Sequence, residues 1–310
     1  MPDKLPVLLD CDTGIDDALA ILYLVNSGLC DLVAVGSVHG NVTALTGARN
    51  TIRVLDVAGL SGIPVVVGAD RPLAQPVDIS AHIHGADGLG NTNQPAPSAD
   101  PAQGEAAQQI IRLARERPGE LTLLAIGPLT NLGLALLLDP DLAKLIPHVV
   151  VMGGAAIAPG NVTTHAEANI WHDPEAANLV FTAGWPVTMV GLDVTMKTLL
   201  SEADQKRIED SQRDTARFSW DILQFYLDRY QEFMGFRTCA LHDPLAAGIA
   251  LERSFATYRK AELRVELRGE HTRGMTVADL RPGRQAESPV ELALQVDAEA
   301  FREKFLDTIC

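Results

Sequence analysis

Apolar and polar positions alternate along this chain in blocks of two kinds. Short, almost uninterrupted apolar runs such as residues 6–9, 31–38 and 121–127 are typical of buried strands. The longer stretches between them, such as 16–29 and 105–120, repeat their apolar residues with helical spacing. Apolar runs without internal alternation are expected for parallel strands that helices cover on both faces. The pattern therefore predicts an α/β fold with a doubly wound, mostly parallel, Rossmann-like sheet.

The last third of the chain follows a different pattern. From about Thr195 it becomes mostly helical through residues 201–233, before a strand-like run at 261–269 and an amphipathic segment at 298–309. We expect these helices to form a C-terminal cap over the strand ends. No Pro-, Gly- or Ser-rich linker divides the chain, so residues 1–310 are predicted to form a single domain.

The composition narrows the classes of partner. The net charge is −15 and no run of Lys or Arg occurs, so nucleic acid and acidic membranes are disfavoured as partners. The chain shows neither a signal-peptide pattern nor an apolar stretch long enough to span a bilayer, and we expect a cytoplasmic protein. The four cysteines have no CxxC spacing, which argues against a zinc ribbon or a disulfide framework.

The stretch LLDCDTGIDDALAIL places Asp10, Asp12, Asp16 and Asp17 between the first predicted strand and its helix. Ligands of open parallel sheets bind at this edge, outside the carboxyl ends of the strands. Helix capping explains one or two of the four carboxylates, but not all of them. Like charges this close repel one another unless they are protonated or bridged by a cation. Because the donors are all oxygens, the cluster predicts a Ca²⁺ or Mg²⁺ site rather than a zinc site.

Two other motifs fit the same stretch less well. An EF-hand loop counted from Asp10 would need Gly and Glu where Ile15 and Ile21 stand, so that interpretation fails. A Mg²⁺ phosphatase of the haloacid-dehalogenase type would use Asp10 as its nucleophile. It also needs a catalytic Lys, for which Lys197 is the one candidate, and a second acidic pair that is not evident. This alternative stays open.

Other predicted strand ends also carry oxygen donors. Each is weak evidence by itself, because Asn beside Gly is common in turns and Thr is a common helix cap. Together they place amides and a carboxylate around one rim, as a polyol such as ribose requires. The residues are Asn41, Thr130, Asn131, Asn161, Glu167 and Asn169.

These residues belong to a set of motifs that resembles a known family. The segments are DCDTGIDDALAIL, HGNV, HGADGLGN, AIGPLTNLGLAL, VVMGG, GNVTTHAEANIWHDPEAA, LHDPLAA and TRGMTV. In this order, and spread over nearly the whole chain, they resemble the inosine-uridine preferring nucleoside hydrolases. The resemblance implies a calcium-dependent enzyme that hydrolyses the N-glycosidic bond of ribonucleosides to ribose and free base.

By this resemblance, Ca²⁺ is held by the carboxylates of Asp12, Asp17 and Asp243 and by the backbone carbonyl of Thr130. Asp10 would support the cluster and reach the metal only through water. Asp12 would take a proton from the attacking water. The residues implied to bind the substrate are Asp16, Asn41, His84, Met152, Asn161, Glu167, Asn169, Tyr226, Tyr230 and Asp243.

The departing base would be assisted by His242, which directly precedes Asp243. A His is suited to proton transfer near neutral pH, but a His at a helix start before a Pro is equally well explained as a surface residue. His82 stands two residues before His84 and is the counterpart of the pocket histidine if that loop is shifted. Tyr226 and Tyr230 lie one helical turn apart, as core-facing aromatic residues also do.

The preferred base is not readable from the sequence. The resemblance implies a homodimer or homotetramer acting on a small ribonucleoside. A third hypothesis is a non-catalytic protein that binds Ca²⁺ and ribose.

Overall fold

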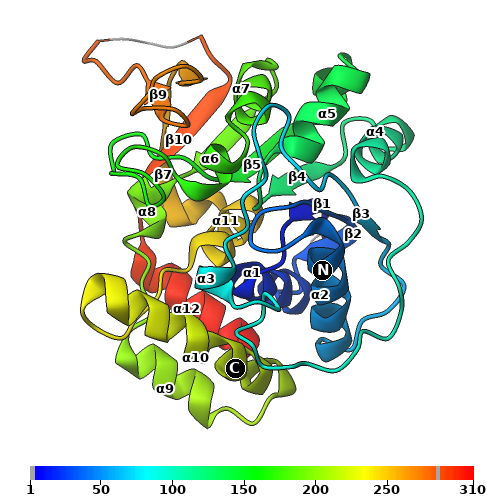
Figure 1. Cartoon of the computed structure of the whole chain (residues 1–310), viewed down its shortest axis with the longest axis vertical. Coiled ribbons are helices and arrows are strands. Elements are labelled where there is room, and N and C mark those ends of the chain that lie inside the picture. The colour runs from blue at the N-terminus through cyan, green and yellow to red at the C-terminus, as the bar shows by residue number, and fades with distance from the viewer. Residues whose placement is uncertain (1–3, 284–286) are drawn as a thin grey trace.

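A central sheet of eight strands organises the computed structural model, which describes residues 4–283 and 287–310 (Figure 1). Its strand order is β3-β2-β1-β4-β5-β6-β10-β7, and all neighbours pair in parallel except β10 and β7. The predicted doubly wound, mostly parallel α/β fold is confirmed. The strands are β1 (Leu5–Cys11), β2 (Cys30–Ser37), β3 (Val65–Val67), β4 (Thr122–Ala125), β5 (His148–Met152), β6 (Val187–Val190), β7 (Ala256–Lys260) and β10 (Val290–Val296).

Helices cover both faces of the sheet, and successive residues of β1 show why. Val7 and Leu9 point into one apolar core, and Leu8 points into the other. Figure 1 shows α4, α5 and α7 on one side of the sheet and α1, α2, α11 and α12 on the other. These helices are α1 (Ile15–Asn26), α2 (Ala44–Val57), α4 (Ala106–Glu116), α5 (Thr130–Leu138), α7 (Pro174–Thr182), α11 (His242–Leu251) and α12 (Ala298–Ile309).

The expected C-terminal helical cap is formed by α9 (Glu202–Asp210), α10 (Asp214–Met234) and α12. Helix α10 contacts α1, α2 and α3 (Ala81–His84), and α12 packs on α1, α9 and α11. The remaining short helices are α6 (Ala168–His172), α8 (Leu192–Thr195), η1 (Leu142–Lys144) and η2 (Arg253–Phe255). Within residues 4–283 and 287–310, no helix combines the length and the apolar character that crossing a membrane demands.

The end of the chain departs from the sequence pattern in two places. The predicted strand at 261–269 is reduced to β8 (Leu263–Val265), which leaves the main sheet and pairs with β9 (Thr276–Ala278). Strand β10 was not predicted, although it lies between β6 and β7 in the main sheet. Only part of β10 is buried, because the short antiparallel edge strand β7 shields it on one side, and its mixed apolar and polar residues reflect that position.

Candidate active site

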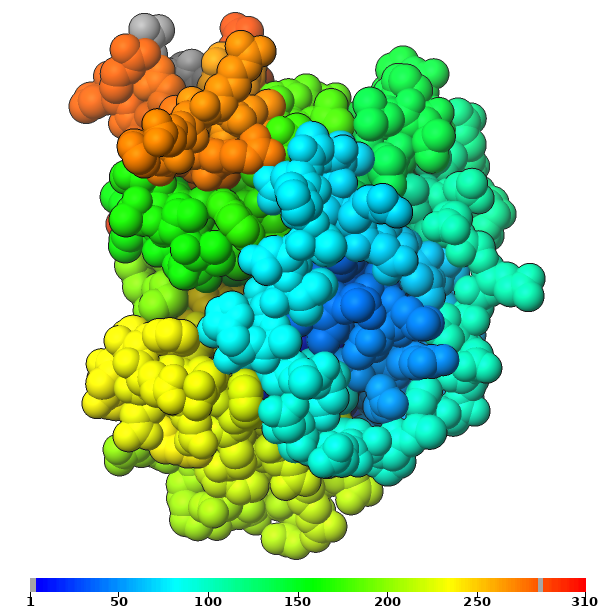
Figure 2. Space-filling view, in the orientation of Figure 1, coloured from blue at the N-terminus to red at the C-terminus, as the bar shows by residue number. Residues whose placement is uncertain are grey.

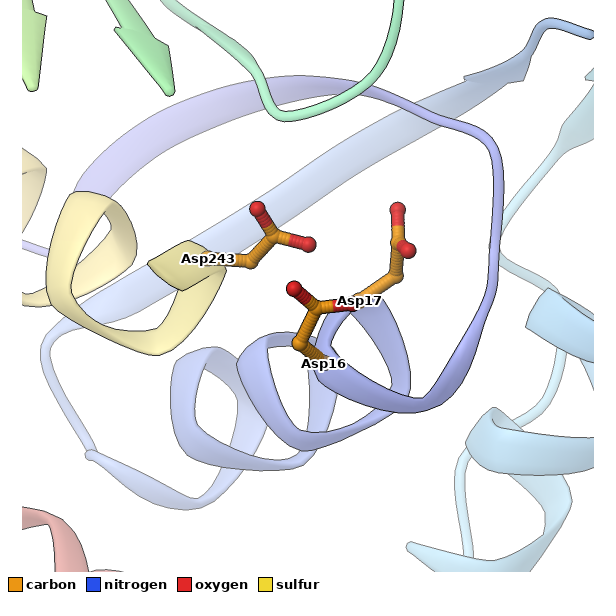
Figure 3. Close-up of side chains that lie close together, drawn as sticks. All are labelled: Asp16, Asp17 and Asp243. Carbon is orange, nitrogen blue, oxygen red and sulfur yellow. The ribbon is translucent and has the colours of Figure 1, made fainter. Parts of the chain in front are cut away.

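The carboxyl ends of the parallel strands meet at one edge, and the starts of α1 and α11 lie there as well. Asp16 and Asp17 stand in the first turn of α1, and Asp243 stands in the first turn of α11. One carboxylate oxygen of each lies within 4.8 Å of the others, and the three carboxyl groups point into one space (Figure 3). Two helix N-termini that face the same point favour negative charge there.

Asp12 and Asp10 extend this group, which we call the carboxylate floor: Asp10, Asp12, Asp16, Asp17 and Asp243. The Asp12 backbone N–H donates to Asp17 Oδ1 at 3.1 Å, and Asp12 Oδ2 accepts from the Asn41 backbone N–H at 2.6 Å. A Cβ on Gly40 would overlap with Asp12 Oδ2, so the chain needs glycine at that position. The floor is therefore built largely by local backbone contacts of the β1–α1 turn.

Burial makes the negative charge of the floor costly. It raises the pKa of Asp10 to about 7 and that of Asp16 and Asp17 to about 6. Burial raises the pKa of Asp12 and Asp243 well above the usual range, and the charges of neighbouring aspartates raise both further. Such a cluster holds protons unless a cation replaces them.

The residues present fit a hard divalent cation. Three carboxylate oxygens of the floor, Asp10 Oδ2, Asp12 Oδ1 and Asp16 Oδ1, are buried without a hydrogen-bond partner. Buried acceptors without partners are rare in folded proteins, and oxygen ligands suit Ca²⁺ or Mg²⁺. The floor can hold a metal ion, with Asp16, Asp17 and Asp243 closest together.

The structure does not bring Thr130 to this group. Thr130 is the first residue of α5, its hydroxyl donates to Asp173 Oδ2 at 2.7 Å, and it lines a separate depression beside residues 67–73. Ile126, one residue beyond β4, does line the pocket, and its backbone oxygen accepts from Asn169 Nδ2 at 2.9 Å. The sequence carried no signal for Ile126, because a backbone oxygen leaves no trace in residue type.

Of the five floor residues, Asp16 and Asp243 line the pocket, whereas Asp10, Asp12 and Asp17 are buried outside its lining. Asp10 Oδ1 accepts from Asn131 Nδ2 at 2.8 Å. Nothing in this placement supports Asp10 as the nucleophile of a phosphatase.

A pocket of about 510 Å³ opens above the floor. Figure 2 shows the surface segments that surround it meeting on one face: residues around α3 in cyan, the loop after β5 in green and the end of α10 in yellow. Among the described residues that line it, none is Lys or Arg. The pocket is also lined by residues for which no role was predicted from the sequence: Asp78, Trp171, His172, Met196, Phe233 and Met234.

One side of the pocket, which we call the ring wall, consists of His84, Tyr226, Tyr230 and His242. His84 and Tyr226 stack with ring centroids 5.3 Å apart, and the Ile15 backbone N–H donates to His84 Nδ1 at 3.1 Å. His84 is buried and packs in this wall, whereas His82 is exposed and also lines the cavity.

His242 is held at both ring nitrogens. Nδ1 lies 2.8 Å from Thr195 Oγ1, and Nε2 lies 2.7 Å from the Tyr230 hydroxyl. Burial lowers the pKa of His242 to about 4, so the ring is neutral near pH 7. Thr195, which the sequence reasoning missed, orients the ring from α8.

Another part of the pocket, which we call the sugar end, carries the polar residues expected to bind sugar. Glu167 caps α6: Oε1 accepts from Asn169 N, and Oε2 accepts from Gly154 N and Ile170 N. Burial raises the pKa of Glu167 to about 7. Asn169 also donates to the carbonyl and the sulfur of Met152. Asn41 and Asn161 line the cavity on either side of this group, so the five predicted residues do lie around one space.

Comparison with known proteins decides the family. Residues 7–303 match the family model described as inosine-uridine preferring nucleoside hydrolase. The chain belongs to the inosine-uridine preferring nucleoside hydrolase family. This membership confirms the resemblance found in the sequence and identifies the protein as an enzyme that hydrolyses the N-glycosidic bond of nucleosides.

Individual relatives agree over nearly their full length. The inosine-uridine preferring nucleoside hydrolase of Crithidia fasciculata is 37% identical, over 100% of this chain and 98% of its own. A pyrimidine-specific ribonucleoside hydrolase of Shewanella woodyi is 39% identical over 88% of each chain. The solved structure of the purine-preferring ribonucleoside hydrolase from Gardnerella vaginalis superposes with a TM-score of 0.93 at 33% identity, covering 98% of each. These names give no support to the phosphatase or to a non-catalytic binding protein.

Proposed function

We propose that this nucleoside hydrolase binds a ribonucleoside with its ribose on the carboxylate floor and its base against the ring wall. The observation that carries the proposal is the convergence of the Asp16, Asp17 and Asp243 carboxylates, two of which, Asp16 and Asp243, line a pocket that the Tyr230–His242 pair also lines. The floor and the sugar end supply acceptors for hydroxyl groups, and the rings supply apolar faces for a base.

We further propose that Ca²⁺ is held by Asp12, Asp17 and Asp243 with the Ile126 carbonyl in the place first expected for Thr130. A bound Ca²⁺ would supply a water of lowered pKa and a partner for the ribose 2′ and 3′ hydroxyls. Asp16 and Asn41 would hold the sugar beside it. Asp10, whose Oδ1 accepts from Asn131 Nδ2, would support the cluster and reach the metal only through water.

The protein's own residues account for the rest of the reaction. Asp12 Oδ1 is a buried acceptor without a partner, which suits Asp12 to take a proton from the attacking water. Positive charge then develops on the ribosyl group, and the surrounding carboxylates stabilise it.

The leaving base requires a proton or a hydrogen bond. A neutral His242 whose Nε2 carries its hydrogen would donate to the Tyr230 oxygen, which would leave the Tyr230 O–H to donate to the base. We propose that His242 donates to Tyr230 and that Tyr230 donates to the base. Tyr230 therefore shares the role that was predicted for His242 alone.

A panel of nucleosides tests this function. Purified protein is expected to release reducing sugar from at least one of inosine, uridine, cytidine and adenosine, and to lose that activity in EGTA and regain it with Ca²⁺. Failure on all four in millimolar Ca²⁺ would contradict the proposal. Mg²⁺ restoring activity better than Ca²⁺ would correct the metal.

The wider setting follows from the same proposal. Release of free base and ribose would serve purine and pyrimidine salvage. A homodimer or homotetramer, a cytoplasmic location and a single domain remain predictions. Light scattering of the purified protein measures the first of them.

A further inference from the structure

The loop after β5 carries Asn161 to the sugar end of the pocket, but it buries few of its own side chains. Ile157 is 72% exposed and Val162 is 43% exposed. Its apolar anchors are small, since Ala155 is buried and Ala156 and Ala158 pack against the two cores, and a loop with such small anchors needs other contacts to keep a binding side chain in place. In this loop the contacts are hydrogen bonds to the backbone.

Asp193, in the short helix α8, makes three of them. Its Oδ2 accepts from the Ala156 backbone N–H at 2.8 Å, and its Oδ1 accepts from Ile157 N at 2.8 Å and Ala158 N at 2.9 Å. Asp193 is 5% exposed, so water competes little for these charge-assisted bonds. An amide in its place would offer one oxygen and would turn an N–H group towards backbone donors.

The far end of the same loop meets the pocket. Asn161 Oδ1 accepts from the Ala168 backbone N–H at 3.0 Å, which leaves its Nδ2 to donate into the cavity. In the proposed binding mode the ribose 2′ and 3′ hydroxyls face the carboxylate floor, which leaves the 5′-hydroxyl for the other polar residues of the pocket, Asn161 among them.

We propose that Asp193 is a positioning residue that fixes the loop at residues 156–158 and, through it, the recognition of the ribose 5′-hydroxyl by Asn161. The inference rests on the proposed function. Asp193 does not touch the substrate; it sets where Asn161 stands. Because α8 also carries Thr195, one short helix supports both the sugar end and His242.

The test compares a ribonucleoside that the wild type hydrolyses with its 5′-deoxy analogue. Asp193→Asn is expected to lower kcat/KM for the ribonucleoside about tenfold, mainly through KM, and to change the value for the 5′-deoxy analogue less than twofold. Asn161→Ala should reduce the discrimination, that is, the ratio of kcat/KM for the ribonucleoside to that for its 5′-deoxy analogue, by the same factor. The double variant should lose no more than either single variant, because both changes remove one interaction.

Asp297→Asn is the matched control. Asp297 caps α12, and its Oδ1 accepts from the Ala300 backbone N–H at 3.0 Å. Asp297 is not among the residues that line the pocket, and it lies far from them in the sequence. It should leave the discrimination unchanged. Asp193→Glu keeps the charge but moves the carboxylate oxygens, so it should also reduce discrimination. It replaces Asp193→Asn in the test if that variant does not fold.

Equal losses on both substrates, or additive losses in the double variant, would overturn the inference. A wild type that hydrolyses no nucleoside would instead overturn the proposed function, so the two failures are distinct.

Discussion

Burial favours the neutral form of the ionisable groups on both sides of the pocket, but the consequence for function differs between the two sides. Burial raises the pKa of the aspartates in the carboxylate floor and lowers the pKa of His84 and His242 in the ring wall to about 4. The floor is built from groups that must be charged to bind a metal, so it depends on an outside cation. The ring wall consists of groups that work while neutral, and His242 within it already has a hydrogen-bond partner in the protein at each ring nitrogen. The pocket therefore combines a carboxylate floor that needs a metal ion to balance its charge with a ring wall whose side chains are held in place by the protein alone.

Metal removal should have the largest effect, because it acts on the carboxylate floor and therefore on the hydrolysis of every substrate. Exhaustive chelation with EGTA is expected to abolish hydrolysis of both inosine and p-nitrophenyl riboside, because the floor serves every substrate. Activity assays before and after Ca²⁺ is restored measure this. Full activity in the chelated protein, with no bound metal by elemental analysis, would mean that the floor works without a cation.

His242→Ala tests the ring wall alone. Hydrolysis of inosine should fall about 10²–10³-fold, whereas p-nitrophenyl riboside, whose leaving group needs no proton, should lose less than about fivefold. Steady-state kinetics on both substrates give the ratio. Similar losses on both would assign His242 a structural role.

Tyr230→Phe should have a smaller effect of the same kind. Removing the hydroxyl leaves His242 Nε2 without its partner at 2.7 Å and is expected to slow inosine hydrolysis about tenfold. Tyr226→Phe is the comparison, because its hydroxyl donates to Asp16 Oδ2 at 3.4 Å instead. If Tyr226→Phe alone shows the selective loss on inosine, the proton path does not run through Tyr230.

The smallest expected effect is on stability and pH. The raised pKa of Asp10 and of Glu167, both about 7, means that the folded protein holds protons that the unfolded chain has already released. Stability of the metal-free protein should therefore fall as pH rises from about 6.5 to about 8. The buried histidines oppose part of this fall, mainly below about pH 7, because their unfolded forms still bind protons near pH 6.5 while the folded forms do not.

Thermal melts in EGTA and in Ca²⁺ at both pH values measure this change. We expect a fall of about 2–5 °C in EGTA and a smaller one in Ca²⁺, since the cation takes the place of the protons. A metal-free protein that gains stability over this range would show that the carboxylates are not protonated in the fold.

The agreement between sequence and structure is uneven across the site. The floor was predictable, because Asp10, Asp12, Asp16 and Asp17 are close in sequence and one turn holds them. His84 and His82 could not be separated by sequence, since a difference of two residues on a short helix decides which ring is buried. By the family resemblance, Thr130 was expected to offer its backbone carbonyl, and it follows a strand end, as ligands often do. The structure places Thr130 in the lining of a separate depression, and the use of Ile126 in its stead is our proposal.

The sequence by itself determined the fold class, the family and the presence of a carboxylate cluster at the first strand end, because those depend on local periodicity and on residues near one another in the chain. The family resemblance had already implied that Asp243 joins this cluster. Only the tertiary structure decided that Tyr230 and Thr195 hold His242 and that Asp193 anchors the loop of Asn161. Those contacts join residues far apart in sequence, and their partners are often backbone atoms. The packing of helices on the sheet selects such contacts, and residue type alone does not encode them.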